Sequence, residues 1–109
     1  MKKTIILATF ISFAAAMTAC AADGKALWEH HCAMCHGVDG NGQTNMGKRL
    51  GVKDYTDAKV QAALTDDAAV KAIKEGFKDK DGKTVMRPSE NLSDADIKDL
   101  VAYMRTLKK

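Results

Sequence analysis

Two cysteines three residues apart, followed at once by a histidine, constrain this chain more than any other feature. They are Cys32, Cys35 and His36. On one helical turn, two such thiols can form thioether bonds to the two vinyl groups of one porphyrin, while the adjacent imidazole lies under the iron. The spacing therefore predicts one covalently attached haem c per chain, with Cys32 and Cys35 as the thioether positions and His36 as the proximal iron ligand.

Other chemistries use a similar spacing but need residues that this sequence does not supply. A structural zinc site takes four ligands, and outside the motif only Cys20, His30 and His31 remain. The two histidines precede the motif on the same expected helix, where surface positions are favoured. A thioredoxin-like dithiol needs a βαβ setting, and no strand pattern surrounds the motif. A chance surface pair of cysteines is the remaining alternative.

The start of the chain has the pattern of an export signal. Lys2 and Lys3 form a short basic start, and residues 4–17 form an uncharged, mostly apolar run. That run is shorter than the ~20 residues needed to cross a bilayer, which favours a secretory signal over a membrane span. We therefore expect a signal peptide over residues 1–22 and export to the periplasm of a bacterium.

Two processing sites fit the residues at the end of this signal. Cleavage after Ala22 leaves a single domain of residues 23–109 without a transmembrane span. Alternatively, a lipoprotein signal ends before Cys20, which then carries a lipid anchor and holds the protein on a membrane facing the periplasm. In both cases Cys20 lies at the processing site, so the odd cysteine count requires no free thiol in the folded domain.

The composition favours one small domain without a nucleic-acid partner. The chain has 109 residues and a formal net charge of +3, which falls to near balance when Lys2 and Lys3 leave with the signal. Basic residues are interspersed with acidic ones, unlike the clustered footprint of a nucleic-acid-binding surface. A domain this short has a modest core, so a large buried cofactor would supply much of it.

Helical periodicity and capping residues predict an all-α domain of about four short helices with long loops. The expected segments are a helix over 23–34, an irregular loop over 37–57, helices over 58–64 and 66–75, and a last helix after Ser93. Asp23 and Ser93 are the expected N-caps of the first and last helices. For the two helices between them, the expected N-caps are Thr56 or Asp57 and Thr65 or Asp66. The last helix has an apolar stripe formed by Ile97, Leu100, Val101, Met104 and Leu107. No segment has a clear strand pattern.

Taken together, these residues resemble the class I c-type cytochromes, specifically the small bacterial monohaem carriers. The resemblance covers residues 23–109 and extends beyond the cysteine motif to Gly24 and Trp28 before it, and to Leu100 and Tyr103 near the end of the chain. In that family the first and last helices cross where these positions meet, with the glycine permitting close approach. The resemblance implies the cytochrome c fold, with helices and long loops wrapped around one covalent haem.

The resemblance also implies a methionine as the distal iron ligand, and Met86 fits best. It lies in the turn before the last helix, where the family presents its axial thioether, usually as Met-Pro. Here Met86 is followed by Arg87 and only then by Pro88, which departs from the family pattern by one residue. The competing loop methionine is Met46.

If His36 and Met86 hold the iron from both sides, no coordination site remains for a substrate. The resemblance then implies an electron carrier and not an enzyme, working as a monomer between a redox protein donor and acceptor, with membrane respiratory complexes as the expected partners. Two alternatives stay open. One is a haem enzyme or a gas or redox sensor with a weak or displaced distal ligand, for which Arg87 is the candidate residue. The other is a docked cytochrome subunit of a larger oxidoreductase.

Charge placement suggests how such partners dock. Lys48, Arg49, Lys83 and Arg87 lie in segments expected to border the exposed haem edge. The acidic residues expected on helices further away are Asp66, Asp67, Asp94, Asp96 and Asp99. This distribution predicts a locally basic docking face that steers partners of opposite charge.

Overall fold

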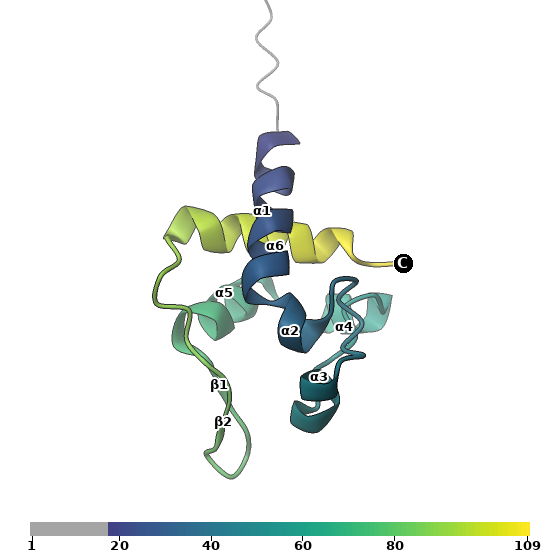
Figure 1. Ribbon diagram of the computed structural model, residues 1–109, viewed down its shortest axis with the longest axis vertical. Helices are drawn as coiled ribbons and strands as arrows, with labels where there is room; N and C mark the ends of the chain where they lie inside the picture. The colour runs from purple at the N-terminus through teal and green to yellow at the C-terminus, as the bar shows by residue number, and fades with distance from the viewer. Residues whose placement is uncertain (1–17) are drawn as a thin grey trace, which may run out of the picture.

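Two helices cross at the centre of the fold, and the rest of the chain is arranged around them. The computed structural model describes residues 18–109, and its first helix, α1 (Thr18–His31), crosses the last, α6 (Asp94–Thr106) (Figure 1). This is the most extensive contact between two elements. A Cβ at Gly24 would collide with the backbone oxygen of Asp99 and with Tyr103. Only glycine lets the two backbones approach this closely, as the family resemblance implied.

The core forms where this crossing meets α5 (Asp66–Glu75). Its buried members are Trp28, Ala69, Leu100, Val101 and Met104. Ile97 is also buried, at 1% exposure, and Leu107 is half-buried. The predicted apolar stripe of the last helix is therefore confirmed. It supplies four of the six buried hydrophobic residues among those that the structure describes.

Short polar side chains start the later helices, as the sequence predicts. The N-caps are Asp57 for α4 (Ala58–Ala63), Thr65 for α5, and Ser93 for α6. Ser93 forms a capping box with Asp96, in which each side chain accepts a bond from the other residue's backbone N–H. These caps satisfy N–H groups that a helix leaves unpaired at its start.

The beginning of the fold differs from the prediction in three respects. Asp23 is not an N-cap, because α1 begins at Thr18 and continues through the alanine-rich residues that precede Asp23, which are good helix formers. The first helix also stops at His31, and α2 (Ala33–His36) follows as a separate turn. The loop expected over 37–57 contains a further helix, α3 (Asn45–Leu50). The described residues thus form six helices where about four were expected.

A small hairpin follows α5 and was not predicted. Strand β1 (Phe77–Lys78) pairs antiparallel with β2 (Thr84–Met86), with Phe77 opposite Met86. In the turn between them, the Asp79 carboxylate accepts bonds from the backbone N–H groups of Asp81 and Lys83. Strands this short leave no alternation that a sequence pattern could reveal. The fold remains essentially helical.

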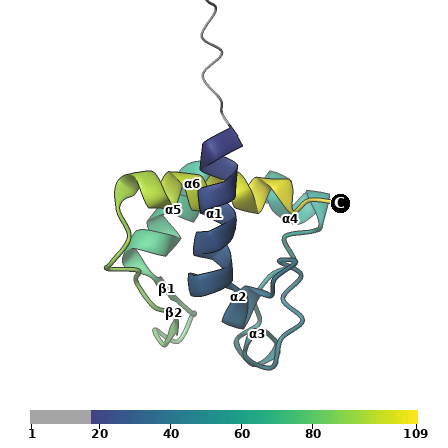
Figure 2. The ribbon, with the colours of Figure 1, turned by 45° about the horizontal axis from the view of Figure 1, so that its top comes forward.

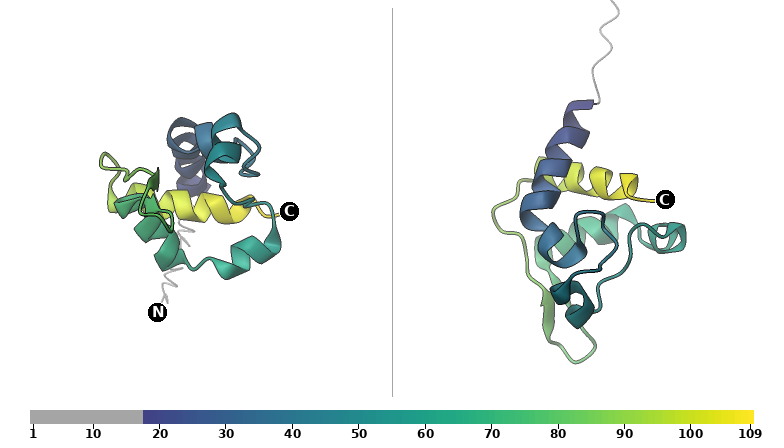
Figure 3. Two further views of the ribbon diagram at one scale, coloured as in Figure 1. Left: turned by 90° about the horizontal axis from the view of Figure 1, so that it is seen from below. Right: turned by 45° about the vertical axis from the view of Figure 1, so that its right-hand side comes forward.

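The remaining elements flank α6 and the motif turn α2. Figure 3 (left) shows α1, α2 and α3 on one side of α6, with α4 and α5 on the other. The hairpin and α3 project towards the same end of the molecule, on either side of α2 (Figures 1 and 2). Among the helices of residues 18–109, none is both long enough and apolar enough to cross a membrane.

Candidate haem site

The cysteine motif occupies a single helical turn, as its spacing predicts. In α2 the backbone N–H of His36 donates to the carbonyl of Cys32 at 2.9 Å, which brings the first cysteine and the histidine to the same turn. Cys35 lies between them, and neither thiol is in a disulfide. Gly37 ends the turn with a φ of 85°, a backbone conformation that favours glycine. The motif is therefore a compact unit that can face one cofactor.

Side chains from two other segments hold this turn in place. The indole Nε1 of Trp28 donates to the carbonyl of Gly37 at 2.9 Å, and the hydroxyl of Thr44 donates to the carbonyl of Cys35 at 2.6 Å. Thr44 also accepts from Gly47 N at 2.8 Å and so caps α3. The sequence analysis did not identify this N-cap. Thr44 directly precedes α3, and threonine is one of the residues preferred at that position.

An open hollow lies beside the motif and brings together three of the four principal candidates. Cys32 and His36 line it from the motif, and Met86 lines it from β2. Met46 and Cys35 are not among the lining residues, and both are half-buried. The rest of the lining is mostly apolar and includes Trp28, Leu64, Ala69, Ile73, Leu100 and Met104. A large, flat cofactor with a mostly apolar face fits such a wall.

The His36 imidazole lies between two aromatic rings on this wall. Its centroid is 5.4 Å from that of Tyr55, in a stacked arrangement, and 5.6 Å from that of Trp28. Its Nδ1 atom is buried and has no hydrogen-bond partner among the described residues. Burial lowers the pKa of His36 below its usual value, so the ring is neutral at pH 7. Neutral imidazole is the form that binds metal.

The Cys32 thiol is not arranged for thiolate chemistry. Burial, and to a smaller extent the neighbouring Cys35, raises its pKa to about 11. At pH 7 the thiol is protonated, whereas the reactive cysteine of a redox dithiol is a thiolate. No group of three or more His, Cys, Asp or Glu side chains suited to a metal occurs within residues 18–109. Within the described residues the motif therefore lacks the four ligands of a structural zinc site.

The hairpin fixes the backbone of Met86. Met86 pairs with Phe77 across the strands, and the N–H of Ser89 donates to the carbonyl of Ile73 at 2.8 Å. A Cβ at Gly76 would meet the Met86 carbonyl and the Pro88 ring. Pro88 therefore lies close to Gly76, the C-cap residue of α5. The departure from the family's Met-Pro pattern does not move Met86 away from the cavity.

The other sequence candidates lie away from the cavity. His30 and His31 are exposed, and Met34 inside the motif is 79% exposed. Arg87 is exposed and does not line the cavity. The predicted signal peptide over residues 1–22 falls mostly on 1–17, outside the described residues.

These observations define a small helical protein with an apolar cavity suited to one haem. A model of the cytochrome c family matches residues 21–108. Cytochrome c-554(547) of Halothiobacillus neapolitanus is 33% identical over 93 residues, which cover 81% of this chain and 97% of that protein. The chain therefore belongs to the cytochrome c family. Membership implies a covalently attached haem c.

Solved structures agree with this assignment. The structure titled KustC0563 c-type cytochrome has a TM-score of 0.69 and 39% identity, covering 80% of this chain and 99% of that one. A point mutant of Kustc0563 has a TM-score of 0.66 and 38% identity, covering 79% and 99%. The all-α cytochrome c fold expected from the sequence is thus confirmed, and the protein is a c-type cytochrome electron carrier.

Proposed function

We propose that this chain is an exported one-electron carrier whose haem is attached through Cys32 and Cys35, with His36 and Met86 as the two axial ligands. One observation carries the proposal. His36 and Met86 line the same cavity although 50 residues separate them. Relatives in the family are electron carriers as a rule, which supports the same role here.

A bound haem c supplies reversible one-electron chemistry at its iron. The protein's contribution is coordination and exclusion of water. An imidazole from His36 and a thioether from Met86 would fill both axial positions, which leaves none for a substrate. A thioether ligand favours the reduced state and raises the potential. The cavity wall includes the apolar residues Trp28, Leu100 and Met104. They would exclude water from the haem, which also raises the reduction potential.

Optical spectra of the purified protein test this assignment. The oxidised protein is expected to show a sulfur-to-iron charge-transfer band, and the reduced protein is expected not to bind carbon monoxide, because both axial positions are filled. Rapid carbon monoxide binding by the reduced wild-type protein would instead point to an open distal position and to an enzyme or sensor. Arg87, the residue that raised this alternative, is exposed and outside the cavity lining, so the structure gives it no support.

We further infer that the carrier works as a monomer in the periplasm, between protein partners that include membrane respiratory complexes. Support comes from the signal pattern of residues 1–22, with cleavage after Ala22 or lipidation of Cys20 as the two outcomes. The similarity to cytochrome c-554(547) spans 97% of that protein's length, which supports a carrier of the same kind.

The residues of the predicted basic docking face lie mainly on two segments of the fold. Lys48 and Arg49 are exposed on α3, and Lys83 is exposed in the hairpin turn. Both segments project at the same end of the molecule beside α2 (Figure 1). Exposed Asp94, by contrast, lies at the start of α6. We therefore expect an anionic redox reagent to react faster than a cationic one at low ionic strength.

Stopped-flow oxidation across salt concentrations measures this preference. It should fade as the Debye length falls from about 30 Å at 0.01 M to about 10 Å at 0.1 M salt. Combined Lys48→Ala and Arg49→Ala substitutions should reduce the low-salt advantage, whereas Lys98→Ala on α6 should change it less. Equal rates for both reagents at all salt concentrations would exclude a basic docking face and favour recognition through apolar contacts.

A further inference from the structure

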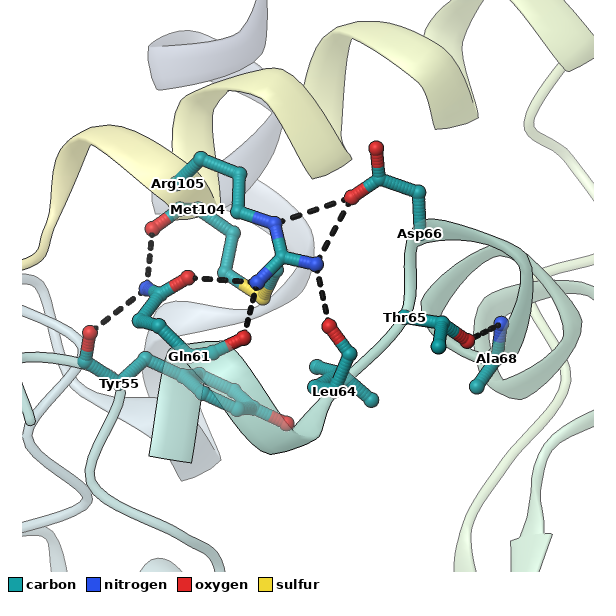
Figure 4. Close-up of polar contacts among 8 residues, drawn as sticks. All are labelled: Tyr55, Gln61, Leu64, Thr65, Asp66, Ala68, Met104 and Arg105. Carbon is teal, nitrogen blue, oxygen red and sulfur yellow. Dashed lines mark hydrogen bonds and ion pairs between the residues drawn. The ribbon is translucent and has the colours of Figure 1, made fainter. Parts of the chain in front are cut away.

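A buried polar junction beside the cavity joins three segments of the chain (Figure 4). At its centre is Gln61 of α4, which is 6% exposed. Its side-chain Nε2 donates to two backbone carbonyls, those of Tyr55 at 2.7 Å and Met104 at 2.9 Å. Both amide hydrogens of Gln61 are therefore used, and they connect the loop before α4 to the last turns of α6.

Arg105 of α6 completes the junction. Its Nη1 atom donates to the backbone carbonyl of Gln61 at 2.6 Å and to the side-chain Oε1 of Gln61 at 3.0 Å. Its Nη2 atom donates to the carbonyl of Leu64. On the outer side, Nε and Nη2 bond Oδ1 of the exposed Asp66 at 3.0 and 2.8 Å. The planar guanidinium thus holds the whole link between α4 and α5 against α6.

The carbonyls bonded by these two side chains share one property. Apart from the carbonyl of Gln61 itself, they belong to Tyr55, Leu64 and Met104, and each of these residues lines the haem cavity. Tyr55 is held on its other side too, since its N–H donates to the carbonyl of Gly40 at 2.8 Å. The N–H and the carbonyl of Tyr55 are thus both hydrogen-bonded. The Tyr55 ring stacks on the His36 ring, with 5.4 Å between the ring centroids.

We propose that Gln61 and Arg105 are positioning residues that set one wall of the haem cavity and thereby raise the reduction potential of the carrier. Loss of the junction removes side-chain bonds to three wall residues at once. The part-buried carbonyls of Tyr55 and Leu64 then lose these partners, which draws water towards the cavity. Water stabilises the oxidised state, which carries one more positive charge on iron, so the potential falls. This inference depends on the proposed function in one respect, because the haem must occupy this cavity.

Redox titration of Gln61→Leu and Arg105→Lys tests the proposal. Leucine fills a similar space without donors, and lysine keeps the charge beside Asp66 but cannot reach the several carbonyls that the guanidinium bonds. For Gln61→Leu we expect the redox equilibrium with a reference couple to shift about tenfold towards the oxidised form, equivalent to about 59 mV for one electron. Arg105→Lys should shift it less, in the same direction. The sulfur-to-iron band should persist in both variants.

Two control variants separate this role from general stabilisation. Ile97→Ala removes a fully buried side chain that does not line the cavity. Asp94→Asn breaks the exposed ion pair with Lys74 at 2.6 Å, another tether between α5 and α6. Both should leave the potential unchanged, although Ile97→Ala lowers the denaturation midpoint. If Gln61→Leu and Arg105→Lys lower the denaturation midpoint but keep the wild-type potential, or if Ile97→Ala shifts the potential equally, the junction has no positioning role.

The same experiment distinguishes this inference from the assignment of the ligands. The wild-type spectrum alone tests whether a haem with a methionine ligand is present. The difference in potential between wild type and Gln61→Leu tests the junction. A normal wild-type spectrum with no difference in potential would overturn the junction and leave the proposed function intact.

Discussion

Replacing Met86 with alanine is expected to abolish the sulfur-to-iron charge-transfer band of the oxidised protein. It should also convert a reduced protein that does not bind carbon monoxide into one that binds it stoichiometrically. The reason is that Met86 lines the cavity together with His36, and its loss would open the distal position. A fall in reduction potential should accompany these changes, since the thioether favours the reduced state.

Met46→Ala is the matched control for this prediction. Met46 is half-buried on α3 and does not line the cavity, so the spectrum of the variant should be that of wild type. Met104 does line the cavity, from α6, and Met104→Leu should retain the sulfur band because leucine preserves the packing. A spectrum that is unchanged in Met86→Ala but altered in Met46→Ala or Met104→Leu would transfer the ligand role.

The second large effect is expected when Cys32 and Cys35 are both replaced with alanine. Covalent haem should fall from one per chain to none, as seen by haem staining after denaturing electrophoresis. Little folded protein should be recovered, because a domain this small loses its largest apolar component and is left with an unfilled, mostly apolar hollow beside the motif. Circular dichroism of the purified variant measures the lost helix.

Met34→Ala provides the comparison for the double cysteine variant. Met34 lies between the two cysteines but is 79% exposed, so this change alters the motif without touching the cavity. Haem content and helicity should match wild type. A double cysteine variant that folds normally without haem would show that the cofactor contributes little to the core.

Local sequence signals predicted the parts of this fold that depend on neighbouring residues. The caps at Thr65 and Ser93 act within their own helical turns, and the stripe of α6 follows from helical spacing. Helix α3 was missed because its six residues, which include a glycine, carry a weak apolar pattern. The start of α1 was missed because Asp23 was taken as the first residue of the folded domain, whereas the preceding residues continue the same helix.

The candidate site also contains some residues that the sequence predicts and others that it does not. The motif residues are contiguous, so their shared turn follows from spacing alone. Met86 came from family resemblance, and its place on the cavity depends on a hairpin with too few residues to produce a pattern. Gln61 and Arg105 lie 44 residues apart. Nothing in the sequence indicates which carbonyls their side chains bond. Contacts of this kind are set by tertiary packing.

The most direct test of the central claim is the mass of the mature chain after extraction in acidic organic solvent, followed by peptide mapping. Haem bound by two thioethers resists this extraction, so we expect the intact chain to retain the mass of one haem. The modification should map to the peptide that contains Cys32 and Cys35, with neither thiol free to alkylate. Haem that extracts into the solvent, or a peptide in which both thiols are free, would contradict the account.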